Sequence, residues 1–185
     1  MIIATAAQLW LIFMAVHELG HVLGALATGG TVQGIELRPW RLSRTELATN
    51  PSPLLVTWAG PILGTALPLV ALGLTHLAAP ISIRRRTRAL AAFCCLVNGV
   101  YIASGTIAPA GDTADLLRLG SPPWTLALFG IPAATAGLWL LHTLGPWLGT
   151  RALTARATTK FLVWTAVATA LLGTAMTTAS LLFPA

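Results

Sequence analysis

The chain has 185 residues, of which 56% are hydrophobic and 9% are charged. Soluble domains carry roughly 25% charged residues, so this composition excludes an ordinary soluble globule and indicates a membrane protein. The net charge of +6 does not indicate nucleic-acid binding, because the basic residues lie in short clusters between apolar stretches, where membrane-edge anchors lie. The clusters are Arg38, Arg41 and Arg44; Arg84, Arg85, Arg86 and Arg88; and Arg151, Arg156 and Lys160.

Hydropathy predicts about five membrane-spanning helices, each near the roughly 20 residues that cross the hydrocarbon core. The first has no basic residue before its long apolar core, so we expect a spanning helix there and not a cleaved signal. The predicted fold class is an all-α polytopic membrane protein that forms a single domain over residues 1–185, with its core over about 1–118. The expected spans are residues 2–28, 53–79, 89–108, 122–147 and 161–183.

Residues 31–38 read TVQGIELR and differ from the spans, because polar and apolar residues alternate weakly there. This pattern predicts a short β-strand or hairpin at the membrane surface, although a plain loop fits it almost as well. Glycines also recur at four-residue spacing, as Gly20 with Gly24 and Gly60 with Gly64. Such pairs predict helix faces that approach closely within the membrane.

The first span contains the sequence HELGH at residues 17–21. On a helix, His17 and His21 lie on one face, one turn apart, so their imidazoles can bind one zinc ion. Glu18 lies about 100° round the helix, where it can take a proton from a metal-bound water and pass it to a leaving amine. A buried His–Glu cluster that only joins helices is the alternative, but a glutamate at mid-bilayer costs about 2–3 kcal/mol and is rarely kept without a use.

A catalytic zinc site needs a third protein ligand. The first and third spans run parallel, so HELGH and the aspartates that follow the third span lie toward the same membrane face. His76 and His142 lie toward the opposite face, and this geometry favours an aspartate, Asp112 or Asp115. The full set of candidates is His76, His142, Asp112, Asp115, Glu46 and Glu36.

Three segments within residues 10–118 resemble the site-2 protease family of intramembrane zinc metalloproteases: HELGHVLGALATGG, WAGPILGTALP, and an Asn-containing span that leads to GDTADLL. In that family an aspartate in a Leu-Asp-Gly motif completes the zinc site, and the resemblance assigns this role to Asp112, leaving Asp115 as a solvated or helix-capping carboxylate. Thr113 stands where the motif has glycine, and Ala110-Gly111 replaces the preceding leucine. The resemblance also implies that Asn98 contacts the substrate backbone or the oxyanion, with a helix-packing amide as the alternative.

The resemblance implies one Zn²⁺ and a zinc-dependent endopeptidase that cuts a transmembrane segment of a membrane-protein substrate. The expected partners are this substrate and membrane lipid, with no nucleic acid. A catalytically silent relative that binds membrane partners without cutting them is the alternative, because Thr113 replaces the motif glycine. A metal transporter is disfavoured, since transporters place ionisable residues along several spans.

The orientation of the chain in the cell membrane rests on its basic residues. The first span has none before it and Arg38, Arg41 and Arg44 after it, which places the active site toward the cytoplasm by the positive-inside rule. Counted over the whole chain, this orientation places seven basic residues on the outer side and four on the cytoplasmic side, which is the opposite of what the rule favours. We give more weight to the first helix, which usually dominates orientation.

Overall fold

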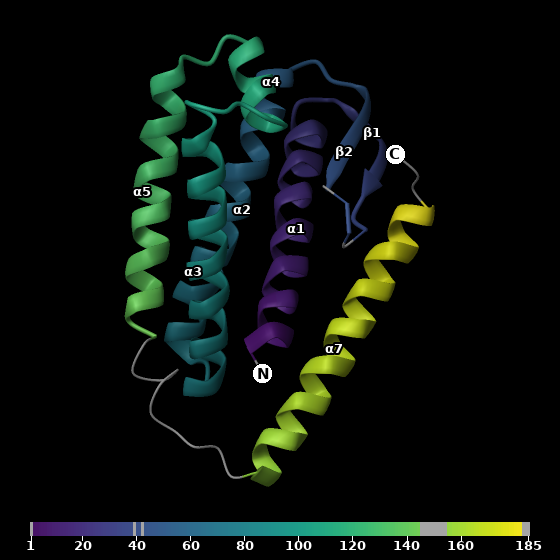
Figure 1. The fold of residues 1–185 in the computed structure, drawn as a ribbon. Helices are drawn as coiled ribbons and strands as arrows, with labels where there is room; N and C mark the ends of the chain where they lie inside the picture. Colours follow the sequence, from purple (N-terminus) through teal and green to yellow (C-terminus); the bar gives the residue numbers. More distant parts are fainter. Residues whose placement is uncertain (1, 39, 42, 145–154, 183–185) are drawn as a thin grey trace.

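The computed structural model describes residues 2–38, 40–41, 43–144 and 155–182 as a helical bundle with a two-stranded hairpin beside it (Figure 1). Within these residues, four helices are long and apolar enough to cross a membrane, namely α1, α2, α3 and α5, and α7 adds the apolar stretch Ala166–Leu182. The predicted class of polytopic helical membrane protein with a short hairpin is therefore confirmed. The elements are α1 (Ile2–Ala27), β1 (Thr31–Glu36), β2 (Arg44–Thr49), α2 (Pro53–Ala78), α3 (Ile81–Ser104), α4 (Asp112–Arg118), α5 (Pro123–His142) and α7 (Ala155–Leu182).

The helix bounds lie within five residues of the expected spans except at the start of α7, which begins at Ala155 and not near residue 161, and at the start of α3. That helix begins at Ile81, directly after Pro80, and not near residue 89. Four arginines fill its first turns and lower the local hydropathy, although they are good helix formers and do not interrupt the helix. The expected spans 122–147 and 161–183 correspond to α5 and α7, and their residues 145–147 and 183 lie outside the described part of the chain.

Glycines set the contact between α1 and α2. A Cβ on Gly20 would lie 2.5 Å from the carbonyl oxygen of Ala59, and one on Gly24 would lie 2.6 Å from the Ala59 Cβ. The two helices therefore touch through backbone atoms and the small Ala59 side chain, as the glycine spacing predicts. Gly99 of α3 and Gly130 of α5 make a similar close approach on the other side of the bundle.

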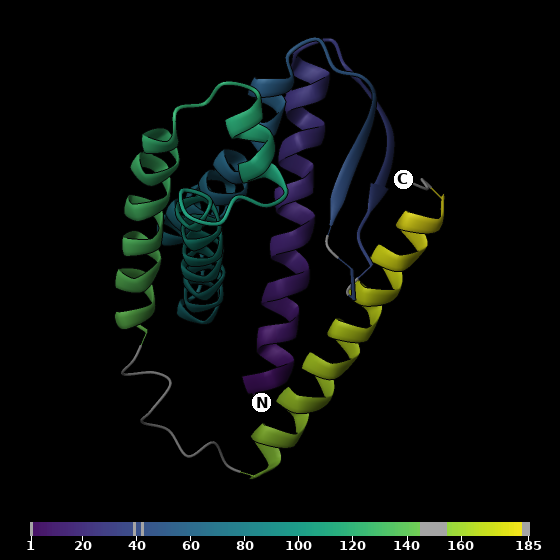
Figure 2. The same cartoon turned by 45° about the horizontal axis from the view of Figure 1, so that its top comes forward.

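The hairpin packs beside α1 on the side where α7 lies (Figures 1 and 2). Its strands are antiparallel, from Thr31 opposite Thr49 to Glu36 opposite Arg44. The backbone N–H of Leu37 donates to the Ser180 hydroxyl at 2.7 Å, which ties the hairpin to α7. The segment expected as a strand is thus the first strand of a hairpin that lies along a spanning helix.

Two apolar clusters fix the positions of α1 and of the short helix α4. One joins α1 to α3 and α7 through Leu11, Phe13, Met14, Cys94 and Met176. The other holds the short helix α4 against α3 and α5 through Ile102, Leu116 and Leu126, each fully buried.

Candidate metal centre

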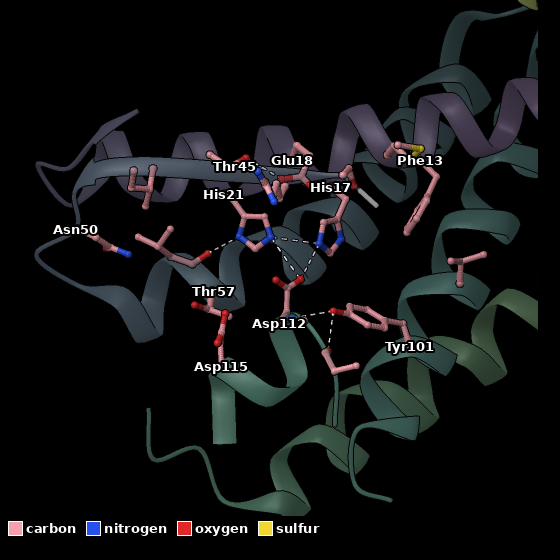
Figure 3. Close-up of a pocket in the computed structure, with 18 of the residues that line it drawn as sticks. Phe13, His17, Glu18, His21, Thr45, Asn50, Thr57, Tyr101, Asp112 and Asp115 are labelled. Carbon is pink, nitrogen blue, oxygen red and sulfur yellow. Dashed lines mark hydrogen bonds and ion pairs between the residues drawn. The ribbon is translucent and has the colours of Figure 1, made fainter. Parts of the chain in front are cut away.

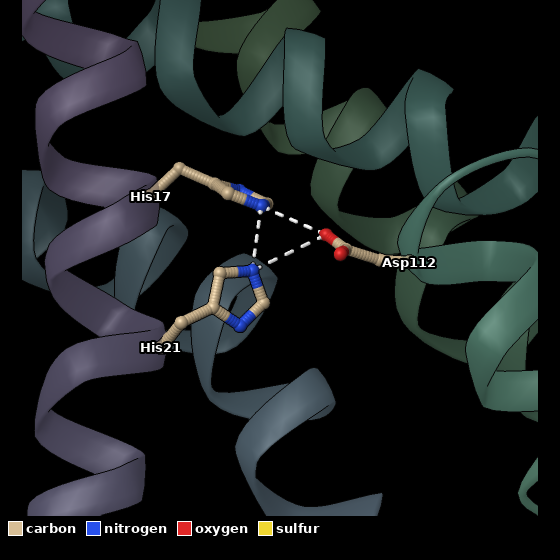
Figure 4. A group of neighbouring side chains, drawn as sticks. All are labelled: His17, His21 and Asp112. Atoms are coloured by element: carbon tan, nitrogen blue, oxygen red, sulfur yellow. Dashed lines mark hydrogen bonds and ion pairs between the residues drawn. The ribbon is translucent and has the colours of Figure 1, made fainter. Parts of the chain in front are cut away.

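His17 and His21 stand one turn apart in the C-terminal half of α1, and both are buried. Their Nε2 atoms are 3.2 Å apart and face the start of α4 (Figure 4). The ring of His21 occupies space that α2 leaves open at Gly60, where a Cβ would lie 2.2 Å from His21 Nε2. The glycine of the AGPILG segment is therefore what gives this imidazole room.

Asp112 is the first residue of α4 and completes the group from the other side of the bundle. Its Oδ2 lies 2.9 Å from His17 Nε2 and 3.4 Å from His21 Nε2. Among the described residues, this is the group of His, Cys, Asp and Glu side chains whose ligand atoms converge closely enough for a metal ion.

These three donor atoms fit a zinc ion. Tetrahedral zinc holds nitrogen and oxygen donors at about 2.0–2.2 Å, which sets the donors about 3.3–3.6 Å from one another. The three separations here, 2.9, 3.2 and 3.4 Å, lie close to that spacing. Two imidazoles and one carboxylate also form a ligand set of catalytic zinc sites, in which a fourth position stays open.

Neutral acceptors orient both imidazoles. His17 Nδ1–H donates to Asn98 Oδ1 at 2.9 Å, and His21 Nδ1–H donates to the Val56 carbonyl oxygen at 2.9 Å. These bonds assign the proton of each neutral ring to Nδ1 and leave the Nε2 lone pairs directed at the centre. Asn98 is fully buried behind His17, so the structure gives it a contact with a candidate ligand. The substrate role that the resemblance implies for Asn98 stays a prediction.

Two hydroxyl groups hold the turn that carries Asp112. The Tyr101 hydroxyl accepts from the Asp112 N–H at 2.8 Å and donates to the Ala110 carbonyl oxygen at 3.1 Å. The Thr113 hydroxyl bonds both the N–H and the carbonyl oxygen of Ala110, at 2.8 and 2.9 Å. Between them, Gly111 has a φ of +53°, a conformation that favours glycine. Thr113, which departs from the family motif, therefore braces the turn.

Glu18 lies beside the three candidate ligands at the wall of a cavity of about 690 Å³ (Figure 3). It is 3% exposed, and its Oε2 accepts a hydrogen bond from the Thr45 hydroxyl at 2.7 Å. Arg44, Thr45 and Leu47 of β2 line the same cavity, so the hairpin forms one of its walls. Apolar side chains of α1, Trp10, Phe13 and Met14, continue the lining away from the polar group.

The other candidate ligands have other partners. Asp115 lines the cavity but pairs with Arg118, Glu46 pairs with Arg44 at 3.0 Å, and Glu36 pairs with Arg38. His76 bonds the Leu72 carbonyl oxygen, and His142 ends α5. The motifs also gave no signal for Tyr101, Thr45 or Val56, which the fold brings to the site from three different elements.

A comparison with protein families matches residues 3–107 of this chain to the family described as Peptidase M50B-like. The match includes HELGH, the AGPILG segment, Asn98 and Tyr101, and it ends before Asp112. Comparisons with curated proteins and with solved structures found no match. The matched residues make up more than half of the chain, and the chain belongs to the Peptidase M50B-like family, the site-2 protease type of membrane protein that its motifs resemble.

Proposed function

We propose that this chain is a zinc-dependent intramembrane endopeptidase, with one Zn²⁺ held by His17, His21 and Asp112. The observation that carries the proposal is the spacing of the three donor atoms, 2.9 to 3.4 Å, with Glu18 beside them on the same helix. Both imidazoles are also oriented by acceptors at Nδ1. A buried polar cluster that only joined helices would not need this convergence of Nε2 atoms on one carboxylate.

The chemistry divides between the metal and the glutamate. When bound, zinc lowers the pKa of water and polarises a peptide carbonyl. Glu18 accepts the proton of the attacking water and delivers it to the nitrogen of the leaving amine. The Thr45 hydroxyl holds one carboxylate oxygen of Glu18 and leaves the other for this transfer. Asn98 and Val56 keep the proton of each ligand imidazole on Nδ1, so that both Nε2 atoms stay available to the metal while the proton moves.

The proposed substrate is a transmembrane segment of another protein, seated in the cavity in extended form. Helical amides are shielded by their own hydrogen bonds, so the segment must unwind before attack. Strand β2 supports this step, because it lines the cavity and has β1 as its partner on one edge. An extended peptide can add to the other edge of such a strand. We therefore propose Arg44–Thr49 as the template for the extended substrate.

Replacing Glu18 by Gln tests the catalytic assignment. The substitution keeps the size of the side chain and removes its basicity, so cleavage of membrane-embedded peptides in proteoliposomes should fall by about 10²–10⁴-fold. Zinc content and helical circular dichroism should stay unchanged. Glu36→Gln is the matched control, because Glu36 pairs with Arg38 and does not line the cavity, and we expect it to cut at the parental rate.

Two outcomes would contradict the proposal. If Glu18→Gln cut as fast as the parent, the glutamate would not be the base. If the parent bound zinc and cut none of the peptides, the chain would be a silent relative that binds membrane partners. The four long apolar helices support placement in a membrane, and the arginines that follow α1 support an active site toward the cytoplasm.

A further inference from the structure

We propose that the end of the bundle remote from the metal centre binds the headgroup of an anionic phospholipid. A small cavity of about 100 Å³ lies where α2 ends and α3 begins. Its polar lining consists of His76 near the end of α2 and Arg84, Arg85 and Arg88 in the first turns of α3. This cavity is separate from the one that contains Glu18 and the three candidate ligands.

The positive charges of Arg84 and Arg88 have no acidic residue near them in the sequence. The sequence contains five acidic residues, and none of them lies between residues 47 and 111 or after residue 115. Each of the five is placed at the metal centre, on the hairpin or on α4. Among the described residues, no acidic side chain forms an ion pair with Arg84 or Arg88, and an external anion can supply the opposite charge there. The five are Glu18, Glu36, Glu46, Asp112 and Asp115.

Neutral groups hold the guanidinium groups in place. Arg84 Nε donates to the Ala79 carbonyl oxygen at 2.7 Å, and Arg88 donates to His76 Nε2 at 3.2 Å. His76 is itself fixed, because its Nδ1–H donates to the Leu72 carbonyl oxygen at 3.0 Å. These contacts orient both arginines without neutralising either charge. Guanidinium groups held in this way suit a phosphate group, which they can bind through paired N–H donors.

The surroundings of the cavity favour a phospholipid over a free anion. Ile81 lines the cavity and is 57% exposed, and Leu74 and Leu77, within two residues of His76 on α2, are 63% and 82% exposed. They belong to α2 and α3, both long and apolar enough to span the membrane, so these side chains face the space that acyl chains fill. A basic pocket between spanning helices with apolar side chains outside it matches both parts of an anionic lipid.

The test uses the purified full-length protein, delipidated in a neutral detergent. Phosphatidylglycerol, phosphatidylcholine and inorganic phosphate are added in separate titrations, with native mass spectrometry and thermal unfolding as readouts. We expect phosphatidylglycerol to bind and raise Tm, and the other two to do neither at equal concentration. In the double variant Arg84→Gln/Arg88→Gln, the affinity for phosphatidylglycerol should fall at least about tenfold. Arg86→Gln is the control, because Arg86 is exposed on the same helix and does not line the cavity.

Three results would overturn the proposal. Equal binding of phosphatidylcholine would mean that the anionic group is not recognised. An equal effect of inorganic phosphate would assign the site to a free anion. An equal loss in Arg86→Gln would mean that the basic surface attracts anionic lipid without a pocket. If the double variant fails to fold, the titrations of the parent protein still test recognition of the anionic group and binding of a free anion. Arg84→Lys/Arg88→Lys then replaces the double variant in the comparison with Arg86→Gln.

Discussion

The hydroxyl of Tyr101 lies 2.8 Å from the backbone nitrogen of Asp112 and accepts its hydrogen bond. Tyr101 belongs to α3, whereas Asp112 starts α4, so this bond fixes the candidate third ligand to a spanning helix. The ring of Tyr101 also packs edge-on to His17, with 6.3 Å between the ring centroids. The Tyr101 side chain therefore contacts two of the three candidate ligands, His17 through its ring and the backbone of Asp112 through its hydroxyl.

Removing this hydroxyl should weaken metal binding without unfolding the protein. In Tyr101→Phe, the Asp112 N–H and the Ala110 carbonyl oxygen lose their partner, and the turn is freed to move. Loss of such an outer contact typically lowers metal affinity about 10–100-fold. Competition with a zinc chelator measures the change. Ser104→Ala is the control, because it removes an exposed hydroxyl that bonds the Tyr101 carbonyl oxygen. An unchanged affinity in Tyr101→Phe would mean that Thr113 alone holds the turn.

Gly60 offers a test from the opposite side of the centre. In Gly60→Ala, the new methyl group would overlap the His21 ring, since the Cβ position lies 2.2 Å from His21 Nε2. We expect the ring to be displaced, zinc to be lost, and cleavage to fall by about 10²-fold or more. Gly73→Ala on the same helix is the matched control, because its Cβ would have nothing within 4 Å. Metal analysis and the proteoliposome assay on both variants make the comparison. Parental zinc content in Gly60→Ala would show that the close contact is not needed.

The hairpin should lose stability in acid. Hydrogen bonds from Arg38 lower the pKa of Glu36 from its ordinary 4.5 to about 2. Because the folded pKa is below the unfolded one, the charged pair stabilises the fold above pH about 4.5, and this stabilisation disappears as pH falls toward 2. Tm of the parent protein should therefore drop over this range more than Tm of Glu36→Gln, measured in the same detergent. Parallel curves for the two proteins would exclude Glu36 as the cause, and Glu46→Gln should follow the parent.

Impermeant thiol labelling tests the orientation. With the metal centre toward the cytoplasm, a cysteine at Arg86 should react with a membrane-impermeant maleimide in intact cells, and one at Arg118 should react only after lysis. Both positions are exposed and carry the same residue type at opposite ends of the bundle. The native Cys94 and Cys95 are buried, which keeps the background low. The reverse pattern would mean that the larger group of basic residues sets the orientation.

The sequence predicted those features that depend on residues within a single helix. The apolar runs predicted the spanning helices, and the four-residue spacing of His17 and His21 predicted that they share a face, because both depend on a single helix. The sequence indicated a strand or hairpin after the first span but did not place strand β2, since RTELAT has two charged residues and no regular alternation. It forms by pairing with β1, a partner that is distant from it by several residues of chain.

The supporting residues of the site could not be read from the sequence for a similar reason. Asn98, Tyr101 and Val56 meet the ligands only when α2 and α3 pack against α1, and that packing depends on glycines whose partners are distant in sequence. Asp112 was chosen by resemblance and by the parallel course of two spans. Spacing along the chain alone did not separate it from Asp115, whereas the fold places Asp112 at the imidazoles and pairs Asp115 with Arg118.

The central claim is that His17, His21 and Asp112 hold one zinc ion, and metal analysis of the purified protein tests it most directly. Asp112→Ala removes the carboxylate at 2.9 Å from His17 Nε2, whereas the control Asp115→Ala removes one that pairs with Arg118. We predict about one zinc per chain in the parent protein and in Asp115→Ala, and a large loss of zinc in Asp112→Ala. A parent protein without zinc after purification in its presence, or full zinc retention in Asp112→Ala, would contradict the account.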